Sequence, residues 1–593
     1  MAWNNNQWVK FLEGYCKGKN QIQDEYVRKV AYRLGTAPLD IKFPWQLEIL
    51  SKFESKENHK LIILTGTAGD GKTKLCRDIV EALDGDEFDE SVWNETSYFS
   101  SEERTVVKDF SELKNEKTRV IQELITILDS QVVPKPILIA VNDGILVEEI
   151  ENFINSTLVN AEKVSARKLK EIIEDKINLG FSQCEGQEVI NLINLSKLNA
   201  KDNISLIFNA ILNNPGWEQC DGCEGKTEKK CAIFNKFQLL KNTPHITENL
   251  SHIILLLQLN NEHFTIRELL NLATNTLLAS IPKPKALRIT ESELSASTLN
   301  CSVMSKIGHP EDFNSESTIE VGFWGMNLGA HKMHYNRPFS ELNKLGFGEL
   351  STNYWDTLLK NKDKRNFSIP LDSNDSLFEG KHISGTDSNN ELWDAIIRRS
   401  RIQLYCYQNN DSNAYHLQRY SNFRSYLESV YNALNSDSKA DDVKTISMII
   451  LSLNRAFHGR YISEFSGQDR LFVPEKGQGS ITPISIFHGE DIRERDIFIE
   501  KIENDMSLSG ARVEPVLILY IDHDKKVKVS LTVELFEYLS QVSRGAPPNT
   551  TDPRLYKKLL ILRSKISTLI RENRRTEMYS IHNGDFKQVI LEV

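Results

Sequence analysis

The most constraining feature of this chain is a glycine-rich segment that joins an apolar run to a helix-forming stretch. The apolar run covers residues 61–64, and the segment that follows reads Gly66-Thr67-Ala68-Gly69-Asp70-Gly71-Lys72-Thr73. The run predicts a buried parallel strand. The segment matches GxxxxGK[ST], in which glycines curl the backbone so that N–H groups face phosphate oxygens. We therefore expect an α/β core that binds a nucleotide.

Each residue of this segment has an expected role. Lys72 would neutralise the β- and γ-phosphates, and the Thr73 hydroxyl would bind Mg²⁺. The helix that begins near Lys72 would add the positive end of its dipole. No GTPase-type base-reading motif stands near the core, so the expected cofactors are ATP and Mg²⁺. The expected nucleotide-binding residues are Gly66, Thr67, Ala68, Gly69, Asp70, Gly71, Lys72 and Thr73.

Strand and helix patterns alternate from residue 61 to about residue 215. The expected strands are 61–64, 105–108, 136–141 and 188–192. The expected helices are 72–83, 114–129, 145–153 and 203–212, with a charged helical insert at 165–176. This alternation predicts a parallel sheet covered by helices on both faces.

The length of 593 residues leaves room for several further domains. The expected division is an N-terminal helical segment (1–58), a P-loop NTPase core (59–215), a cysteine cluster with a helical lid (216–300), a mainly helical domain (301–470) and a β-rich segment with basic C-terminal helices (471–593). We expect the whole to be an α/β protein with a parallel-sheet P-loop NTPase core of AAA+-like type, a helical lid and a mixed α+β C-terminal region.

A magnesium-binding acid is expected where a second buried strand ends. The apolar strand 136–141 is followed by Asn142 and Asp143, and Asp143 is the favoured candidate. Asp109, after the shorter strand 105–108, is the alternative. Asn142 stands where the first acid of the usual pattern would be. Because a neutral amide binds Mg²⁺ weakly, this predicts slow or partner-dependent hydrolysis.

Two further positions could respond to the γ-phosphate. Asn194, or alternatively Asn191, ends the strand after the expected magnesium site, although an asparagine there can equally cap a turn. Arg267 begins a helix in the expected lid and could reach a γ-phosphate. It could equally pair with Glu262 or lie on a solvated face.

Three of the eight cysteines, Cys220, Cys223 and Cys231, lie within twelve residues of one another. A CxxC pair can direct two thiolates at one metal, and structural zinc takes four sulfur or nitrogen ligands. The cluster is therefore a candidate zinc site, with a reduced, metal-free loop as the alternative. The candidates for the fourth ligand are Cys184, His245, His252 and His263.

The net charge of −10 argues against a surface built to coat nucleic acid, but the last helix is strongly basic. Its cations alternate with Leu555, Leu559, Leu560 and Ile566, which predicts an amphipathic helix that meets DNA, an acidic partner or only solvent. The cations are Arg554, Lys557, Lys558, Arg563, Lys565, Arg571, Arg574 and Arg575. Arg398, Arg399 and Arg401 form a second basic cluster. Asp522-His523-Asp524-Lys525 is expected to be the turn of a β-hairpin.

The chain shows no apolar run of about 20 residues and no basic-then-apolar N-terminal order. Eight cysteines in so long a chain do not make a disulfide framework. We therefore expect a cytoplasmic protein without a membrane partner.

Several segments together resemble the ATPase subunit of DNA-phosphorothioation-dependent restriction systems, a family of bacterial anti-phage P-loop ATPases of AAA+/STAND-like type. Besides the glycine-rich segment they are Ala140-Val141-Asn142-Asp143-Gly144, Cys231-Ala232-Ile233-Phe234-Asn235, Phe264-Thr265-Ile266-Arg267-Glu268-Leu269-Leu270 and Leu453-Asn454-Arg455-Ala456-Phe457-His458-Gly459. The resemblance implies an ATPase that works with other subunits of a defence complex, as a homo- or hetero-oligomer, on foreign DNA. Two alternatives stay open: a nucleotide-dependent scaffold with little turnover, and a STAND-type sensor that oligomerises on a phage trigger.

Overall fold

The computed structural model describes most of the chain in two compact units. The described residues are 6–16, 24–54, 60–114, 116–157, 159–179, 187–227, 231–278, 406, 420–436, 443–474, 492–501, 508, 510–521, 525–570 and 579–588. The first unit comprises residues 1–258, 262–414 and 503–512, and the second comprises 259–261, 415–502 and 513–593. The expected boundary at residue 470 lies inside the second unit.

The first unit is built on a five-stranded, mostly parallel sheet, so the α/β prediction is confirmed. Its strands are β1 (Leu61–Thr65), β2 (Tyr98–Ser100), β3 (Thr105–Val107), β4 (Ile137–Ala140) and β5 (Ile190–Asn194), in the order β2-β3-β4-β1-β5. The expectation of an entirely parallel sheet is wrong at β2, which pairs antiparallel with β3. Only a four-residue turn, closed by the Ser101 N–H to the Arg104 carbonyl, joins the two strands. A parallel pair would need a crossover of a dozen residues or more.

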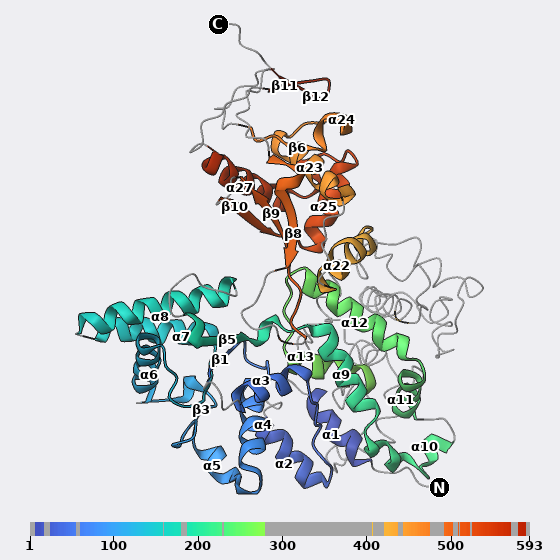
Figure 1. Ribbon diagram of the computed structural model, residues 1–593. Helices are drawn as coiled ribbons and strands as arrows, with labels where there is room; N and C mark the ends of the chain where they lie inside the picture. The colour runs from blue at the N-terminus through green and yellow to red at the C-terminus, as the bar shows by residue number, and fades with distance from the viewer. Residues whose placement is uncertain are drawn as a thin grey trace, which may run out of the picture. The chain divides into compact units, whose positions relative to one another are not determined.

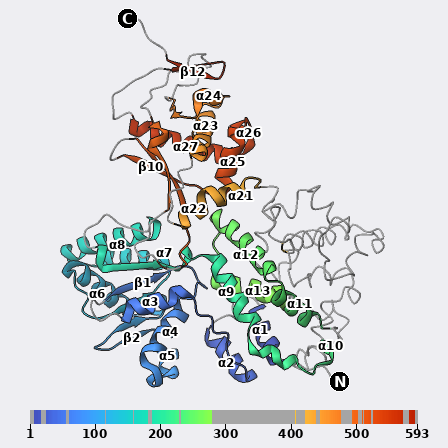
Figure 2. The ribbon, with the colours of Figure 1, turned by 45° about the vertical axis from the view of Figure 1, so that its right-hand side comes forward.

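Helices cover both faces of this sheet. The helices of the first unit are α1 (Gln7–Cys16), α2 (Asp24–Leu34), α3 (Pro44–Glu54), α4 (Lys72–Asp84), α5 (Glu90–Glu95), α6 (Glu116–Ser130), α7 (Asp143–Ser156), α8 (Asn160–Leu179), α9 (Ala200–Leu212), α10 (Glu224–Thr227), α11 (Ala232–Asn242), α12 (Pro244–Leu259, which ends at the unit boundary) and α13 (Ile266–Leu278). Figures 1 and 2 show α7 and α8 on one side of the sheet and α4 on the other.

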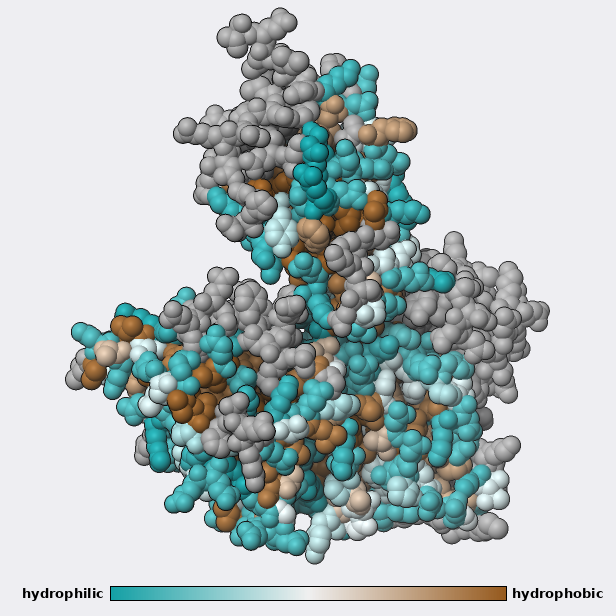
Figure 3. Space-filling model, in the orientation of Figure 1, coloured by the Kyte–Doolittle hydropathy of each residue, from teal (hydrophilic) through white to brown (hydrophobic). Residues whose placement is uncertain are grey.

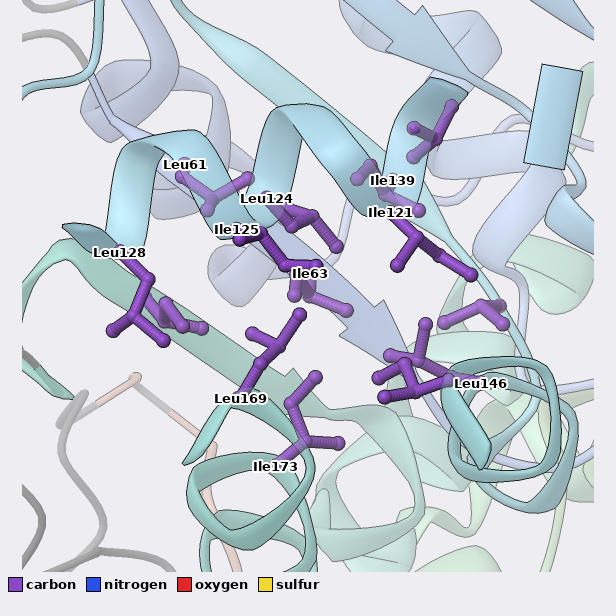
Figure 4. Close-up of a cluster of buried hydrophobic side chains, with 14 of the residues drawn as sticks. Leu61, Ile63, Ile121, Leu124, Ile125, Leu128, Ile139, Leu146, Leu169 and Ile173 are labelled. Carbon is purple, nitrogen blue, oxygen red and sulfur yellow. The ribbon is translucent and has the colours of Figure 1, made fainter. Parts of the chain in front are cut away.

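The core on the α6–α8 side explains why α8 is longer than expected. Alternate residues of β1, Leu61 and Ile63, pack against apolar residues of α6, α7 and α8, and Figure 4 shows this cluster. Leu169 and Ile173 of α8 are fully buried in it. The segment expected as a charged helical insert is therefore a helix that completes the core, and of its charged residues Lys176 is buried while the others are half-buried or exposed.

The boundaries of two elements at the site differ from those expected from the sequence. The fourth parallel strand was expected at 188–192 but is β5, residues 190–194, because a 3-10 turn precedes it. Helix α7 was expected to begin at Ile145 but begins at Asp143, with Asn142 as its N-cap residue. Both shifts place polar side chains directly at the carboxyl ends of strands.

The second unit is mixed α+β. Its elements are α21 (Phe423–Tyr426), a π-helical turn (Leu427–Tyr431), α22 (Asn432–Asn435), α23 (Val443–His458), α24 (Glu464–Gly467), β6 (Arg470–Leu471), β7 (Ile492–Arg493), β8 (Ile497–Lys501), β9 (Pro515–Tyr520), β10 (Lys526–Ser530), α25 (Val533–Ser543), α26 (Pro548–Thr551), α27 (Pro553–Ile570), β11 (Tyr579–His582) and β12 (Asp585–Gln588). The expected hairpin is confirmed as β9 paired antiparallel with β10, and β8 adds a third strand. Of its expected turn, residues 522–524 lie outside the described residues.

Helix α23 is the centre of the second unit, and α25 and α27 both pack against it. Arg455, only 3% exposed, donates hydrogen bonds to the carbonyls of Ile462, Val542 and Ser543. The last two carbonyls end α25, so the guanidinium caps that helix. The nearby Asn454 bonds to the backbone of residues 467, 470 and 472. The segment 453–459 thus joins the helices of this unit to its loops.

The face drawn in Figure 3 intersperses apolar residues among hydrophilic ones. Within the described ranges, every helix is too short or too polar to span a lipid bilayer.

Candidate nucleotide-binding site

The carboxyl ends of four strands meet at one edge of the sheet of the first unit. In the register, Leu64 lies beside Ala140 on one side and Ile193 on the other. Because β1, β3, β4 and β5 are parallel, the segments that follow them, which begin at Gly66, Lys108, Val141 and Leu195, leave the sheet at this same edge. Ligands of open α/β sheets bind in the crevice outside the carboxyl ends of the strands.

The segment 66–73, which we call the glycine loop, curls at three glycines. Gly66, Gly69 and Gly71 have φ angles of 134°, 106° and 89°, a region that side-chain-bearing residues rarely adopt. A Cβ atom on Gly66 would lie 2.7 Å from an Asp70 carboxylate oxygen. Gly71 is the N-cap residue of α4, so the loop leads directly into the positive end of this helix.

Lys72 lies over the loop. Its Nζ donates to the carbonyl oxygens of Gly66 and Thr67, at 2.8 Å each. Burial lowers the pKa of Lys72, and the negative charges of Asp70, Asp143 and Asp109 oppose that effect. The ammonium group is therefore held among three carboxylates. The Thr73 residue, one position further, is exposed.

Both candidate magnesium acids lie near this lysine. Asp143 Oδ1 accepts a hydrogen bond of 2.9 Å from the Gly66 N–H, which ties β4 to the base of the glycine loop. The carboxylate of Asp109 accepts from the Ser111 N–H at 2.9 Å and caps a short 3-10 turn. Asn142, before Asp143, makes no side-chain cap bond. The geometry brings Asp143 into direct contact with the loop and leaves Asp109 within electrostatic range of Lys72.

Asp70 is the most enclosed charge of the site, with 2% of its surface exposed. Its Oδ2 accepts from the Thr67 N–H at 2.6 Å and from the Ser196 hydroxyl at 3.0 Å. Its Oδ1 lies 3.0 Å from His263 Nε2. Burial alone would raise the pKa of Asp70, but the hydrogen bond and charge of His263, together with Thr67 and Ser196, hold it below its usual value.

The segment before α13 packs directly on the loop. The Arg267 N–H donates to the Gly69 carbonyl at 3.1 Å. A Cβ atom on Gly69 would lie 3.2 Å from the Arg267 Cβ and 3.3 Å from the Thr265 hydroxyl. Thr265 and Glu268 exchange the two hydrogen bonds of a capping box, which fixes the start of α13. Arg267 Nε is buried and has no partner among the described residues, so the expected lid arginine lies at the loop with a free donor.

The side chains of the two asparagines of β5 form hydrogen bonds with backbone groups. Asn194 Oδ1 accepts from the Ser196 N–H at 2.9 Å and caps the turn that follows β5. Asn191 Nδ2 donates to the Leu61 carbonyl at 3.2 Å. Asn194 therefore positions Ser196, and Ser196 in turn contacts Asp70. The hydrogen bond of Asn194 is that of a turn cap, which was the alternative interpretation of this residue.

The three clustered cysteines are buried and line one small cavity of about 10 Å³, together with Asn6 and Trp217. Asn6 Nδ2 donates to Cys220 Sγ at 3.1 Å. Among the described residues, no three or more histidine, cysteine, aspartate or glutamate side chains are grouped so that they could hold a metal ion. His263, one candidate fourth ligand, contacts Asp70 instead, and Cys184 lies outside the described residues. A zinc site stays a prediction.

The basic residues of the second unit are less available than their number suggests. Arg554 pairs with Glu534 at 3.0 Å, and Arg563 donates to the Phe457 carbonyl at 2.7 Å. Burial lowers the pKa of Lys558. Lys557 and Lys565 are exposed. The remaining candidates of this unit, Arg571, Arg574 and Arg575, lie outside the described residues, and so do Arg398, Arg399 and Arg401 of the first unit.

Two residues of the site were not expected from the sequence. His263 was considered only as a zinc ligand, and Ser196 was not considered. The available signal was Asp70 itself, because a carboxylate inside a curled loop needs donors, and short polar residues after β5 and before α13 could supply them.

No protein-family model, no curated protein and no solved structure matches this chain.

Proposed function

We propose that this protein binds ATP with Mg²⁺ at the glycine loop and hydrolyses it. The observation that carries the proposal is the loop itself, which follows a buried parallel strand, curls at three positive-φ glycines and opens helix α4 at Lys72. Backbone N–H groups in such a curl, a helix N-terminus and a lysine together make an anion site suited to phosphates. The exposed Thr73 is free to meet a magnesium ion.

In this proposal Asp143 holds Mg²⁺ or orients the attacking water, and Asp109 is the alternative. Asp143 has the stronger support because its carboxylate already contacts the loop at Gly66. Carboxylates are the oxygen ligands through which Mg²⁺ is usually bound beside substrate phosphates. Arg267, with its free donor, would stabilise charge on the γ-phosphate. Asn194 would act through Ser196 rather than on the nucleotide.

From the resemblance to anti-phage restriction ATPases we further propose that this activity serves a defence complex that acts on foreign DNA. The other subunits of such a complex would be the partners, and DNA would be met through the complex.

A substitution of Lys72 tests the proposal. Lys72→Ala should abolish binding of ATP to the purified protein and protection of cells from phage together, because the loop loses its only lysine. Lys74→Ala is the matched control: it removes a lysine from the same helix, where Lys74 forms an ion pair with Asp78. ATP binding and phage protection at wild-type levels in Lys72→Ala would refute the energy-dependent function.

A second candidate function is a scaffold or STAND-type sensor that binds nucleotide but turns it over slowly. Asn142 before Asp143, and the commitment of Asp143 Oδ1 to the Gly66 N–H, favour it. Steady-state phosphate release, with and without DNA, separates the two functions. Fast release that Asp143→Ala abolishes would contradict the scaffold. A nucleotide-dependent change of mass in light scattering would support the sensor.

A further inference from the structure

Asp70 connects the glycine loop to two segments far away in the sequence. Its donors are Thr67 in the loop, Ser196 after β5 and His263 before α13. A carboxylate this deeply buried is costly unless its oxygens are hydrogen-bonded. The three segments are therefore fixed to one another through one side chain.

A second set of contacts links Asp70 to Lys72. Thr67 binds Lys72 Nζ with its carbonyl and Asp70 with its N–H and hydroxyl. When Lys72 turns toward phosphate, the Thr67 carbonyl loses this partner, and any movement of Thr67 is passed to Asp70. From Asp70 it reaches His263, which also lies 3.2 Å from the Thr67 hydroxyl.

The His263 contact is built so that it can release. The side chain of His263 is 27% exposed, whereas that of Asp70 is 2% exposed. Nδ1 of His263 is buried without a partner among the described residues, so one of its two ring nitrogens gives nothing to hold the ring in place. Two residues further on, Thr265 and Arg267 pack on Gly69. A change at His263 would therefore reach the start of α13.

We infer that His263 is a positioning residue that couples occupancy of the glycine loop to helix α13 through Asp70. The inference rests on the proposed nucleotide binding. The contact between His263 and Asp70 slows the release of bound ATP, and α13 becomes more ordered when ATP binds.

The test measures release of a fluorescent ATP analogue from the full-length protein by stopped flow. His263→Ala and Asp70→Asn should each speed release by roughly tenfold, the size of a typical coupling between sites. The double variant should release no faster than either single variant, because both remove the same contact. His263→Gln, whose amide can still donate to Asp70, should recover most of the retention.

Hydrogen exchange of residues 265–278 gives a second readout. ATP should slow exchange in the wild type and not in His263→Ala. The inference would be overturned if His263→Ala and Asp70→Asn kept wild-type release rates and unchanged ATP-dependent protection. Loss of ATP binding in Lys72→Ala would show that the proposed function nevertheless holds. A wild type that does not bind the analogue at all would overturn the proposed function, and the inference with it. Circular dichroism verifies that each variant is folded. If His263→Ala is not folded, Asp70→Asn, whose side chain is nearly isosteric with that of the wild type, tests the inference.

Discussion

Single side chains at the sheet edge of the first unit are bound to the backbone of the glycine loop and to a few neighbouring side chains. Lys72 donates to loop carbonyls, Asp143 accepts from the Gly66 N–H, and Asp70 is hydrogen-bonded by three residues, Thr67, Ser196 and His263. Such bonds keep the loop curled before any ligand arrives, which reduces the ordering that binding must supply. The chemistry of the site therefore depends on which of these side chains can exchange its present partner for a phosphate, a metal ion or a water molecule.

The two acids near Lys72 should differ in effect. Asp143→Asn keeps an oxygen for the Gly66 N–H but removes the charge, so ATP binding should persist while Mg²⁺-dependent turnover falls about 100-fold or more. Asp109→Asn should lower turnover by less than tenfold, because its carboxylate is committed to Ser111. Phosphate release at saturating ATP measures both. The opposite ranking would identify Asp109 as the metal-binding acid.

A histidine in the second unit should make stability depend on pH. Enclosure of the ring lowers the pKa of His458 to about 3, even though its Nε2 donates to the Phe472 carbonyl. In the unfolded chain its pKa is about 6.5. Between these values only the unfolded state binds the proton, so stability falls as pH drops from about 6.5 toward 3, by up to about 1.4 kcal/mol per pH unit.

Urea unfolding of wild type and His458→Gln between pH 7 and pH 4 measures this. The glutamine amide can still donate to Phe472, so the variant should lose less stability on acidification. Equal losses in the two proteins would mean that His458 is protonated in the folded state as well.

Whole elements are held by polar contacts as well as by apolar packing. In the second unit, the buried Arg455 links α23 to the end of α25 and to the turn at Ile462. In the first unit, the capping box of Thr265 and Glu268 starts α13, and the Arg267 N–H within this first turn donates to the Gly69 carbonyl. Such contacts fix the end of an element in place, which an apolar stripe alone does not do.

Arg455→Lys should destabilise the second unit by about 2–3 kcal/mol. A lysine ammonium cannot supply the fork of donors that the guanidinium directs at three carbonyls, so at least one buried acceptor loses its bond. Urea unfolding followed by the fluorescence of the chain measures the loss. Arg424→Lys is a matched control, because Arg424 is exposed and forms an ion pair with Glu428, four residues further along the chain. A loss below 0.5 kcal/mol for Arg455→Lys, roughly the value for a surface position, would contradict this role.

At the scale of the molecule, the net charge of −10 opposes DNA binding except where cations gather. Helix α27 was expected to present many of them. Leu555, Leu559 and Ile566 are buried as expected, with Leu559 1% and Ile566 0% exposed, and the helix packs on β10 and α23. Of its cations, Arg554 and Arg563 are already engaged. Few charges of α27 are left for phosphates.

We therefore expect weak DNA binding by the isolated chain, with a small contribution from α27. If Lys557 and Lys565 meet phosphates, the double charge reversal Lys557→Glu/Lys565→Glu should reduce the slope of log affinity against log salt by about 2, at about 0.9 per contact. Fluorescence anisotropy on duplex DNA measures this slope between about 20 and 200 mM salt, a range over which screening of surface charges increases strongly. An unchanged affinity for DNA at low salt would show that these lysines of α27 do not contact DNA. Arg563→Glu is the wrong probe, because it would also break the bond to Phe457.

The sequence by itself determined the features that are local: the strand β1, the curled loop after it, the helix α4, and the alternation that makes an α/β sheet. These follow from contiguous patterns of apolar residues and glycines, whose conformational preferences act over a few residues. It also predicted the β9–β10 hairpin and the burial of one face of α27.

Only the tertiary structure decided which distant side chains meet. Ser196 and His263 lie more than a hundred residues after Thr67 in the sequence, yet all three bind Asp70, because parallel strands end at one edge and α13 returns to the glycine loop. The same holds for Arg563, whose partner is a carbonyl in another helix. Hydrogen-bond partners of this kind depend on the path of the whole chain, and no local pattern encodes them.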